Sequence, residues 1–233
     1  MIDTSISANL RRHIEKLCRS SRYPKTRGYF EAQKYIRHEL ETLDLTPKLQ
    51  EFRLFHGMYT NIFAEQIHEG RPLVLIGAHY DARSCSPVGA DDNASAVAVL
   101  LELARRLRSD TSKSYIFTFF DLEEYYWGRS LQRSKAFVRA YLQKPDFVVI
   151  LDLVGGVFAP GFENSYMQFG SALSMLEEEH LEFLHLPLEL IEPFGPIMAR
   201  SDYHAFRKKG VPFTFLSSGT PWYYHTCFDT PDI

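Results

Sequence analysis

Histidines and carboxylates directly follow several apolar segments of this sequence, or open its helical segments. Taken singly, each has an ordinary structural role available, as a buried histidine, a helix N-cap or a solvated loop residue. Taken together, they match the imidazole and carboxylate ligands that zinc binds in proteins. The residues in question are His79, Asp81, Asp91, Asp92, Glu123, Glu124, Asp152 and His225.

The number of these residues fits a site for two metal ions. Two ions about 3.5–4 Å apart need one bridging carboxylate, and each ion then takes one histidine and one further carboxylate. The set offers two histidines and three acids for these positions, and a further acid to act as a base. The spacing of His79 and Asp81 also supplies a carboxylate that can orient the imidazole of a metal ligand.

The segments before these residues predict a mainly parallel sheet. Four runs are apolar throughout and alternate with helical patterns, as is typical of parallel strands covered on both faces. Ligands of such sheets bind beyond the carboxyl ends of the strands, so we expect the histidines and acids to meet at one edge. The runs are 72–78, 115–120, 147–151 and 211–216.

Helical and antiparallel patterns complete the predicted fold. Two strands, 47–55 and 60–66, flank a turn at Gly57 and predict an antiparallel pair. We therefore predict an α/β fold: a three-layer α/β/α sandwich around a mixed, mainly parallel twisted sheet, formed as a single domain over 1–233. Apolar spacings predict helices at 6–19, 29–43, 95–107, 128–142 and 202–208.

Six motifs together resemble those of the co-catalytic zinc aminopeptidases. That superfamily includes bacterial leucyl aminopeptidases, glutaminyl cyclases, glutamate carboxypeptidase II and the transferrin-receptor ectodomain. The ordered set covers nearly the whole chain, which makes the resemblance highly specific. The motifs are AHYD (78–81), GADDNASAVAVLLELAR (89–105), FFDLEE (119–124), ILDLVG (150–155), SDYHAF (201–206) and YHTCFDTPD (224–232).

The resemblance implies a ligand for each position of a dinuclear zinc site. The acid before the asparagine of the second motif, Asp92, would bridge the two ions. One ion would take His79 and Asp152, and the other Glu124 and His225.

The resemblance also implies the residues that act beside the zinc ions. Glu123 matches the general base, which would take a proton from water and pass it to the leaving amine. Asp81 matches the residue that supports the first histidine, and Asp91 would be a loop or capping residue. The implied activity is that of an aminopeptidase, which removes the N-terminal residue from a peptide with a free N-terminus.

Aromatic residues near the motifs are candidates for a substrate pocket. Each one singly is better explained by core packing, but as a group they could line an apolar pocket for the terminal side chain of the substrate. Tyr224 or Tyr223 could also donate to the oxyanion. Asp202 is a further substrate-binding candidate, although Tyr203 stands where the family usually has histidine. The aromatic group is Trp127, Phe194, Trp222, Tyr223 and Tyr224.

Other functions also occur among proteins with this pattern. A glutaminyl cyclase has the same fold but uses one zinc ion and forms N-terminal pyroglutamate without adding water. Residues 89–93 and the DTPD ending look more like the peptidases, whereas 222–225 and 23–24 are similar to the cyclases. A non-catalytic binding protein of the receptor type is less well matched, because such members typically lose ligands and here the whole set is present. A carboxypeptidase with a lid domain is disfavoured because no segment between the motifs is long enough to form one.

Composition limits the partners and the cellular location. The net charge is −3 and no long basic run occurs, so we expect no nucleic-acid partner. No apolar stretch reaches about 18 residues, so no membrane span is expected. The three cysteines, Cys18, Cys85 and Cys227, do not form a disulfide framework. Without a visible secretory signal the sequence as written is expected in the cytoplasm, or in a secreted or periplasmic location if a signal has been removed.

The end of the chain also departs from the family pattern. The family normally continues past DTPD into a last helix that packs on the sheet, and this sequence stops at Ile233. Without that helix an apolar face of the sheet would be exposed, which would favour a homodimer.

Overall fold

A computed structural model describes most of the chain. The described residues are 4–54, 57–124, 132–141, 143–156, 165–170, 182–186, 201–219 and 221–232. Among them are the strands β1 (Lys48–Leu54), β2 (Gly57–Gln66), β3 (Leu73–His79), β4 (Ser114–Phe120), β5 (Phe147–Leu151), β6 (Ser165–Gly170), β7 (Glu182–Leu186) and β8 (Phe213–Ser217). The helices are α1 (Thr4–Leu17), α2 (Arg27–Thr42), the π-helical turn η1 (Ala90–Ser95), α3 (Ala96–Leu107), α4 (Gln132–Ala140) and α7 (Tyr203–Arg207).

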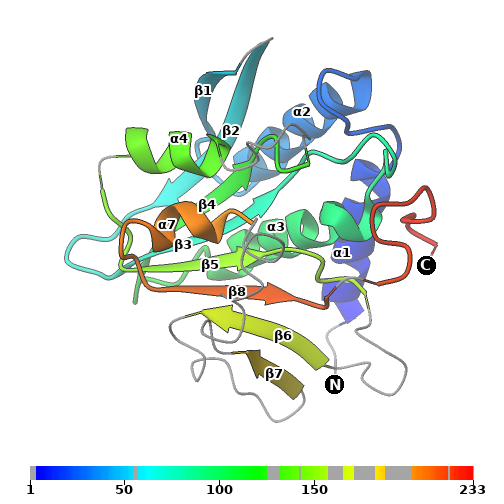
Figure 1. Cartoon of the computed structure of the whole chain (residues 1–233). Helices are drawn as coiled ribbons and strands as arrows, with labels where there is room; N and C mark the ends of the chain where they lie inside the picture. The colour runs from blue at the N-terminus through cyan, green and yellow to red at the C-terminus, as the bar shows by residue number, and fades with distance from the viewer. Residues whose placement is uncertain are drawn as a thin grey trace.

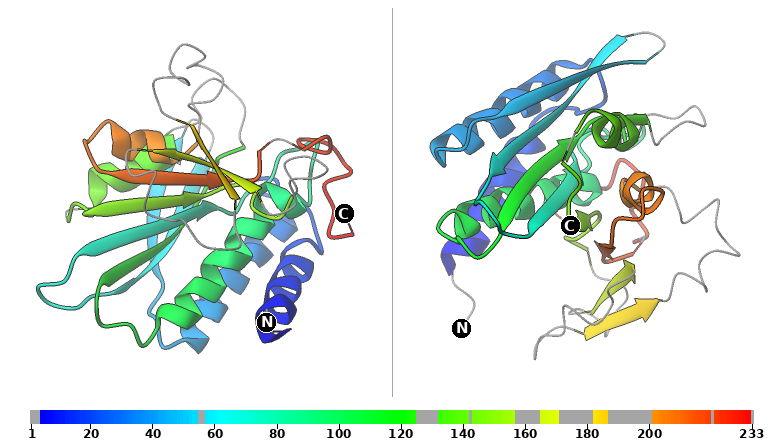
Figure 2. Two further views of the ribbon diagram at one scale, coloured as in Figure 1. Left: turned by 90° about the horizontal axis from the view of Figure 1, so that it is seen from below. Right: turned by 90° about the vertical axis from the view of Figure 1, so that its left-hand side faces the viewer.

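The strands form one mixed sheet between two layers of helices (Figure 1). The strand order is β1-β2-β4-β3-β5-β8-β6-β7. Helices α1, α2 and α3 cover one face, and α4 and α7 cover the other, as the right-hand view of Figure 2 shows. The predicted α/β/α sandwich is confirmed.

The centre of the sheet is parallel, as its continuous apolar strands predict. Strands β4, β3, β5 and β8 pair in parallel, and they correspond to the four apolar runs of the sequence. The predicted antiparallel edge is also confirmed, since β1 pairs antiparallel with β2 and β2 with β4. The hairpin is tighter than predicted: Leu54 pairs with Gly57, so β2 begins at Gly57 itself.

The other edge of the sheet was not predicted from the sequence. Strand β6 pairs antiparallel with β8, and β7 pairs parallel with β6. Their sequences, SYMQFG and EFLHL, mix polar and apolar residues and lack the continuous apolar character of the central strands. The pattern that identifies a strand buried on both faces is therefore absent here.

The helices begin and end close to the predicted positions. Helix α2 starts two residues before the predicted 29–43, because the side chain of Thr26 accepts a hydrogen bond from the backbone N–H of Tyr29 and caps it. Of the predicted helix 128–142, residues 132–140 form α4, whereas 128–131 and 142 lie outside the described residues. None of the helices in the described ranges combines the length and apolar character that crossing a membrane requires.

Strand β4 links the two hydrophobic cores. Successive side chains of a strand point to opposite faces of its sheet. Accordingly, Phe117 and Phe119 pack in the core beneath α1, α2 and α3, whereas Ile116 and Phe120 pack in the core beneath α4 and α7. All four are fully buried, so the strand that leads to Glu123 is fixed from both sides.

We expect Phe117→Ala to destabilise the fold strongly. Phe117 has no exposed surface, so the change leaves a cavity in the core and should lower the free energy of unfolding by about 3–5 kcal/mol. Urea denaturation followed by circular dichroism would measure the change. Phe30→Ala is the matched control, because Phe30 is 45% exposed on α2 and its loss should change stability far less. Equal losses in the two variants would contradict the description of the core.

Candidate metal centre

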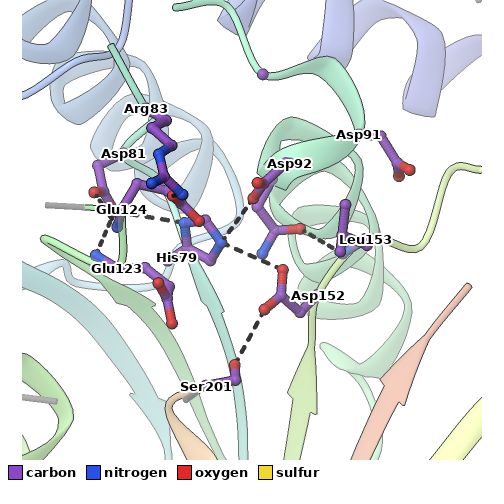
Figure 3. Close-up of polar contacts among 12 residues, drawn as sticks. His79, Asp81, Arg83, Asp91, Asp92, Glu123, Glu124, Asp152, Leu153 and Ser201 are labelled. Atoms are coloured by element: carbon purple, nitrogen blue, oxygen red, sulfur yellow. Dashed lines mark hydrogen bonds and ion pairs between the residues drawn. The ribbon is translucent and has the colours of Figure 1, made fainter. Parts of the chain in front are cut away.

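The carboxyl ends of the central strands bring the predicted residues to one edge of the sheet. His79 is the last residue of β3 and lies in register with Phe120, the last residue of β4. Asp152 directly follows β5, and Asp92 lies in η1. Figure 3 shows the side chains of His79, Asp92 and Asp152 converging from these separate elements.

Asp92 lies between two histidines. One carboxylate oxygen, Oδ1, is 3.2 Å from Nε2 of His79, and the other, Oδ2, is 3.2 Å from Nε2 of His225. Each histidine also meets a second carboxylate: His79 Nε2 lies 3.3 Å from Asp152 Oδ1, and His225 Nε2 lies 3.1 Å from Glu124 Oε2. The arrangement is two histidine–carboxylate pairs that share one acid.

The donor set fits a divalent cation. One ligand atom each from His79, Asp92 and Glu124 lies within 4.8 Å of the other two. Within the described residues, Oδ2 of Asp92 is buried and accepts no well-directed hydrogen bond, although Nε2 of His225 lies 3.2 Å away. A buried carboxylate oxygen without a directed donor is costly unless a cation compensates it. Imidazole nitrogen with carboxylate oxygen is a ligand set that suits zinc.

The electrostatics of the cluster also favour a cation. Burial disfavours the charged form of His79, but Asp152, Asp81 and Asp92 outweigh it and raise the pKa of His79 well above its usual value. For Asp92, burial is likewise outweighed, and contacts with His225 and His79 lower the pKa of its carboxyl. Three acids so close together repel one another, and positive charge among them relieves the repulsion.

Asp81 lies beside the first histidine and holds the loop after β4. Its Oδ1 lies 3.4 Å from Nδ1 of His79, on the side of the ring away from Asp92. The same carboxylate accepts hydrogen bonds from the backbone N–H groups of Glu123 (2.8 Å) and Glu124 (2.9 Å). The sequence suggested the support of His79, but nothing in it indicated this second role, which depends on contacts between distant segments.

Asp229 positions the loop that carries Asp92, a role that the sequence analysis missed. Its carboxylate accepts hydrogen bonds from the backbone N–H groups of Asp91 (2.7 Å) and Asp92 (3.1 Å). Gly89 opens this loop with a φ of 46°, and a Cβ there would lie 2.0 Å from the carbonyl oxygen of Asp92. The conformation therefore requires glycine at 89. In the sequence, Asp229 follows the last apolar run within the DTPD motif, and nothing local indicates this role.

Two neighbours of Asp92 fasten η1 to the end of β5. The side chain of Asn93 donates to the carbonyl oxygen of Leu151 and accepts from the backbone N–H of Leu153, both at 3.2 Å. Asp91 points away from the cluster (Figure 3) and accepts a hydrogen bond of 2.7 Å from the N–H of Gly155. Burial raises the pKa of Asp91 to about 6. These contacts agree with a structural role for Asp91.

Glu123 and Ser201 lie beside the cluster. Glu123 is 9% exposed, and Figure 3 shows its side chain beside that of His79. Ser201, just before α7, donates from Oγ to Oδ2 of Asp152 at 3.1 Å. Ser201 lies in the SDYHAF motif, but the sequence alone indicates no role for it.

The residues predicted for substrate binding differ in placement. Tyr224 stacks on the ring of His225, with ring centroids 3.6 Å apart. Trp222 is 74% exposed, and its ring contacts those of Tyr223 and Phe228. Asp202 is buried.

The structure describes one of three further aromatic residues that the sequence singled out near the motifs. Tyr203 packs in the core, stacked on Phe213, so the residue in place of the family histidine has a structural role. Two predicted aromatic residues, Trp127 and Phe194, lie outside the described residues.

A buried acid lies behind the cluster and connects it to α2. Asp121 has no exposed surface and accepts hydrogen bonds from the hydroxyl of Tyr29 and from the backbone N–H of Thr60. Burial, together with the charge of Asp81, raises the pKa of Asp121 to about 7. Folding therefore favours the protonated form of this acid.

Three comparisons relate the chain to known proteins. The sequence model described as "Peptidase family M28" matches residues 61–233. The "Uncharacterized protein YfbL" of Escherichia coli is 37% identical over 126 residues, a match that spans 49% of this chain but only 39% of that protein. The "Glutaminyl-peptide cyclotransferase" of Boiga irregularis is 27% identical over 265 residues, covering 91% of this chain and 72% of that protein.

Solved structures with the same fold include both activities. A leucine aminopeptidase precursor from Bacteroides thetaiotaomicron superposes with a TM-score of 0.77 at 18% identity, covering 97% of this chain and 90% of that one. A glutaminyl cyclase from Porphyromonas gingivalis superposes with a TM-score of 0.75 at 21% identity, covering 97% and 91%. At these identities the likeness establishes the fold and does not distinguish the two reactions.

We expect Asp229→Asn to weaken metal binding without unfolding the chain. The amide replaces one of the two acceptor oxygens that hold the N–H groups of Asp91 and Asp92, so the bridging acid loses its fixed position. Loss of such an outer contact typically lowers metal affinity about 10–100-fold. Zinc titration against a chromogenic chelator would measure it, with Asp232→Asn, at an exposed position, as the control. Equal affinities in the two variants would contradict a positioning role for Asp229.

Asp121 should make stability depend on pH in a defined direction. Its native pKa of about 7 lies above the value of about 3.9 for a solvated aspartate, so its contribution is full below pH 4 and is lost as pH rises through 7. Relative to Asp121→Asn, the wild type should therefore lose stability by up to about 1.4 kcal/mol per pH unit in this window. Urea unfolding at several pH values, with a chelator present, would measure the difference. A difference that did not change with pH would contradict the raised pKa.

Proposed function

The chain belongs to peptidase family M28, and on this basis we propose that it is a zinc-dependent aminopeptidase that removes the N-terminal residue of peptides. The observation that carries the proposal is the position of Asp92, which offers one carboxylate oxygen to each of two histidine–carboxylate pairs. Asp92 would bridge two zinc ions. His79 and Asp152 would complete one coordination site, and His225 and Glu124 the other.

Glu123 is the base in this proposal. Bound zinc would supply Lewis acidity, which makes a water more acidic and polarises the scissile carbonyl. The carboxylate of Glu123 would accept the proton of that water and later give it to the nitrogen of the leaving amine. The hydrogen bond from the Glu123 N–H to Asp81 would hold the base in place during both transfers.

The surroundings of the site would select a free N-terminus. Acidic side chains crowd the cluster, so a protonated α-amine is attracted to it and a blocked amide is not. The exposed ring of Trp222 and the ring of Tyr224 stacked on His225 offer apolar surface for the terminal side chain of the substrate.

A glutaminyl-peptide cyclotransferase is the second candidate. What favours it is that a curated cyclotransferase aligns with 91% of this chain, far more than the 49% covered by the match to YfbL. In this reaction Glu123 would take a proton from the α-amine of an N-terminal glutamine and give it to the departing ammonia, with no water added. A single zinc ion would suffice.

One paired assay separates these activities. The purified protein, with its zinc content measured, is given an aminoacyl anilide and, in parallel, a peptide with N-terminal glutamine. An N-acetylated peptide is the control. Release of free amino acids from unblocked substrates alone supports the aminopeptidase. Pyroglutamate formation without hydrolysis would replace it with the cyclase, and the absence of both would remove the enzymatic proposal.

We expect Glu123→Gln to retain zinc but lose turnover. The amide keeps the shape of the side chain and removes its basicity, so kcat should fall about 10²–10⁴-fold. Steady-state kinetics and metal analysis on the same sample would measure both effects. Glu69→Gln, an exposed position, is the matched control and should retain activity. Wild-type turnover in Glu123→Gln would contradict its role as the base.

A further inference from the structure

Arg83, which has no part in the site proposed above, contacts its second histidine. It lies in the loop between β3 and η1 and contacts the C-terminal segment that carries His225. Its Nη1 lies 2.5 Å from Nδ1 of His225 and 3.8 Å from Oε2 of Glu124. A guanidinium group therefore lies against one of the two histidine–carboxylate pairs.

The Arg83 guanidinium lies against both nitrogens of the His225 ring. Its Nη1 is 2.5 Å from Nδ1 and 3.3 Å from Nε2, the nitrogen that faces Asp92 and Glu124. A cation held by that nitrogen and Glu124 would therefore lie next to the positive charge of Arg83. Arg83 in this position and metal binding at His225 oppose each other.

The first histidine has the opposite environment. The carboxylate of Asp81 lies 3.4 Å from Nδ1 of His79, on the side of the ring away from the nitrogen that faces Asp92 and Asp152. Asp81 also adds negative charge behind that pair, whereas Arg83 adds positive charge beside the other. At these distances a like charge opposes a divalent ion by both repulsion and competition for Glu124.

We propose that Arg83 makes the two halves of the metal site unequal. A divalent cation binds tightly between His79, Asp152 and Asp92, and a second binds weakly at His225 and Glu124 because Arg83 must first turn away. Arg83 is 27% exposed in its side chain, so it has solvent to turn into. The proposal rests on the metal site proposed above, and it assigns Arg83 control of how many ions the chain holds at a given metal concentration.

The test is zinc titration of the metal-free full chain, with free zinc set by a chelator buffer. The wild type should bind one ion tightly and a second at least about tenfold more weakly, a difference of about 1.4 kcal/mol. Arg83→Met should strengthen the weak site about tenfold or more and leave the tight site within a factor of about two. Arg83→Gln, which also removes the charge, should behave in the same way and replaces Arg83→Met if that variant does not fold.

Three further variants assign the effect to this contact. Arg83→Lys keeps the charge and should retain most of the difference, and Arg71→Met, at an exposed position far from the cluster, should change nothing. In a His225→Gln background the weak site is lost, so adding Arg83→Met should have no effect on zinc binding.

The outcomes separate this proposal from the proposed function. Two equally tight ions in the wild type, or an unchanged weak site in both Arg83→Met and Arg83→Gln, would overturn the role of Arg83 and leave the dinuclear site standing. Failure of any zinc to bind would overturn both.

Discussion

The crowding of acids in a buried space is the constraint on which the rest of the site depends. Asp92, Glu123 and Asp152 are each at most 9% exposed, and Asp81 is fully buried. Ionised carboxylates are not stable together in such surroundings unless donors or cations surround them. Backbone N–H groups satisfy Asp81 and Asp229, and imidazoles face Asp92. Oδ2 of Asp92 accepts no well-directed hydrogen bond within the described residues, and a cation between the two histidine–carboxylate pairs would compensate this charge.

The parallel centre of the sheet makes this crowding possible. The register places the ends of β3 and β4 side by side, so His79 and the loop to Glu123 start from the same edge. Local hydrogen bonds then set the remaining geometry: Asp81 fixes the loop after β4, and Asn93 fastens η1 to the end of β5. The sheet brings these segments to one edge. A few long-range hydrogen bonds then fix the positions of the ligand side chains.

This division explains what the sequence could predict. The central strands and the edge at which the acids meet follow from continuous apolar runs, a local pattern that any single sequence displays. Strands β6 and β7 carry no such pattern, and the clamp by Asp229 joins residues far apart along the chain. Arg83 is the clearest example of what the sequence does not predict. Arginine is common in loops, and its proposed role follows only from its contact with His225. Sequence spacing predicts which residue types come together at the site. It does not predict which other residues contact each ligand, such as Asp81 at His79 and Arg83 at His225.

The residues that contact the two histidines, Asp81 and Arg83, bear directly on the choice between the two candidate reactions. Hydrolysis by a pair of ions needs both halves of the site filled, whereas cyclisation of an N-terminal glutamine needs one ion and no water. The two halves share Asp92 and have nearly identical distances, so their ligands alone do not rank them. What ranks them is the group behind each histidine, a carboxylate at His79 and a guanidinium at His225. Because one fold serves both reactions among its relatives, metal count is a simple variable on which the activity could turn, and in this chain it depends on residues outside the ligand set.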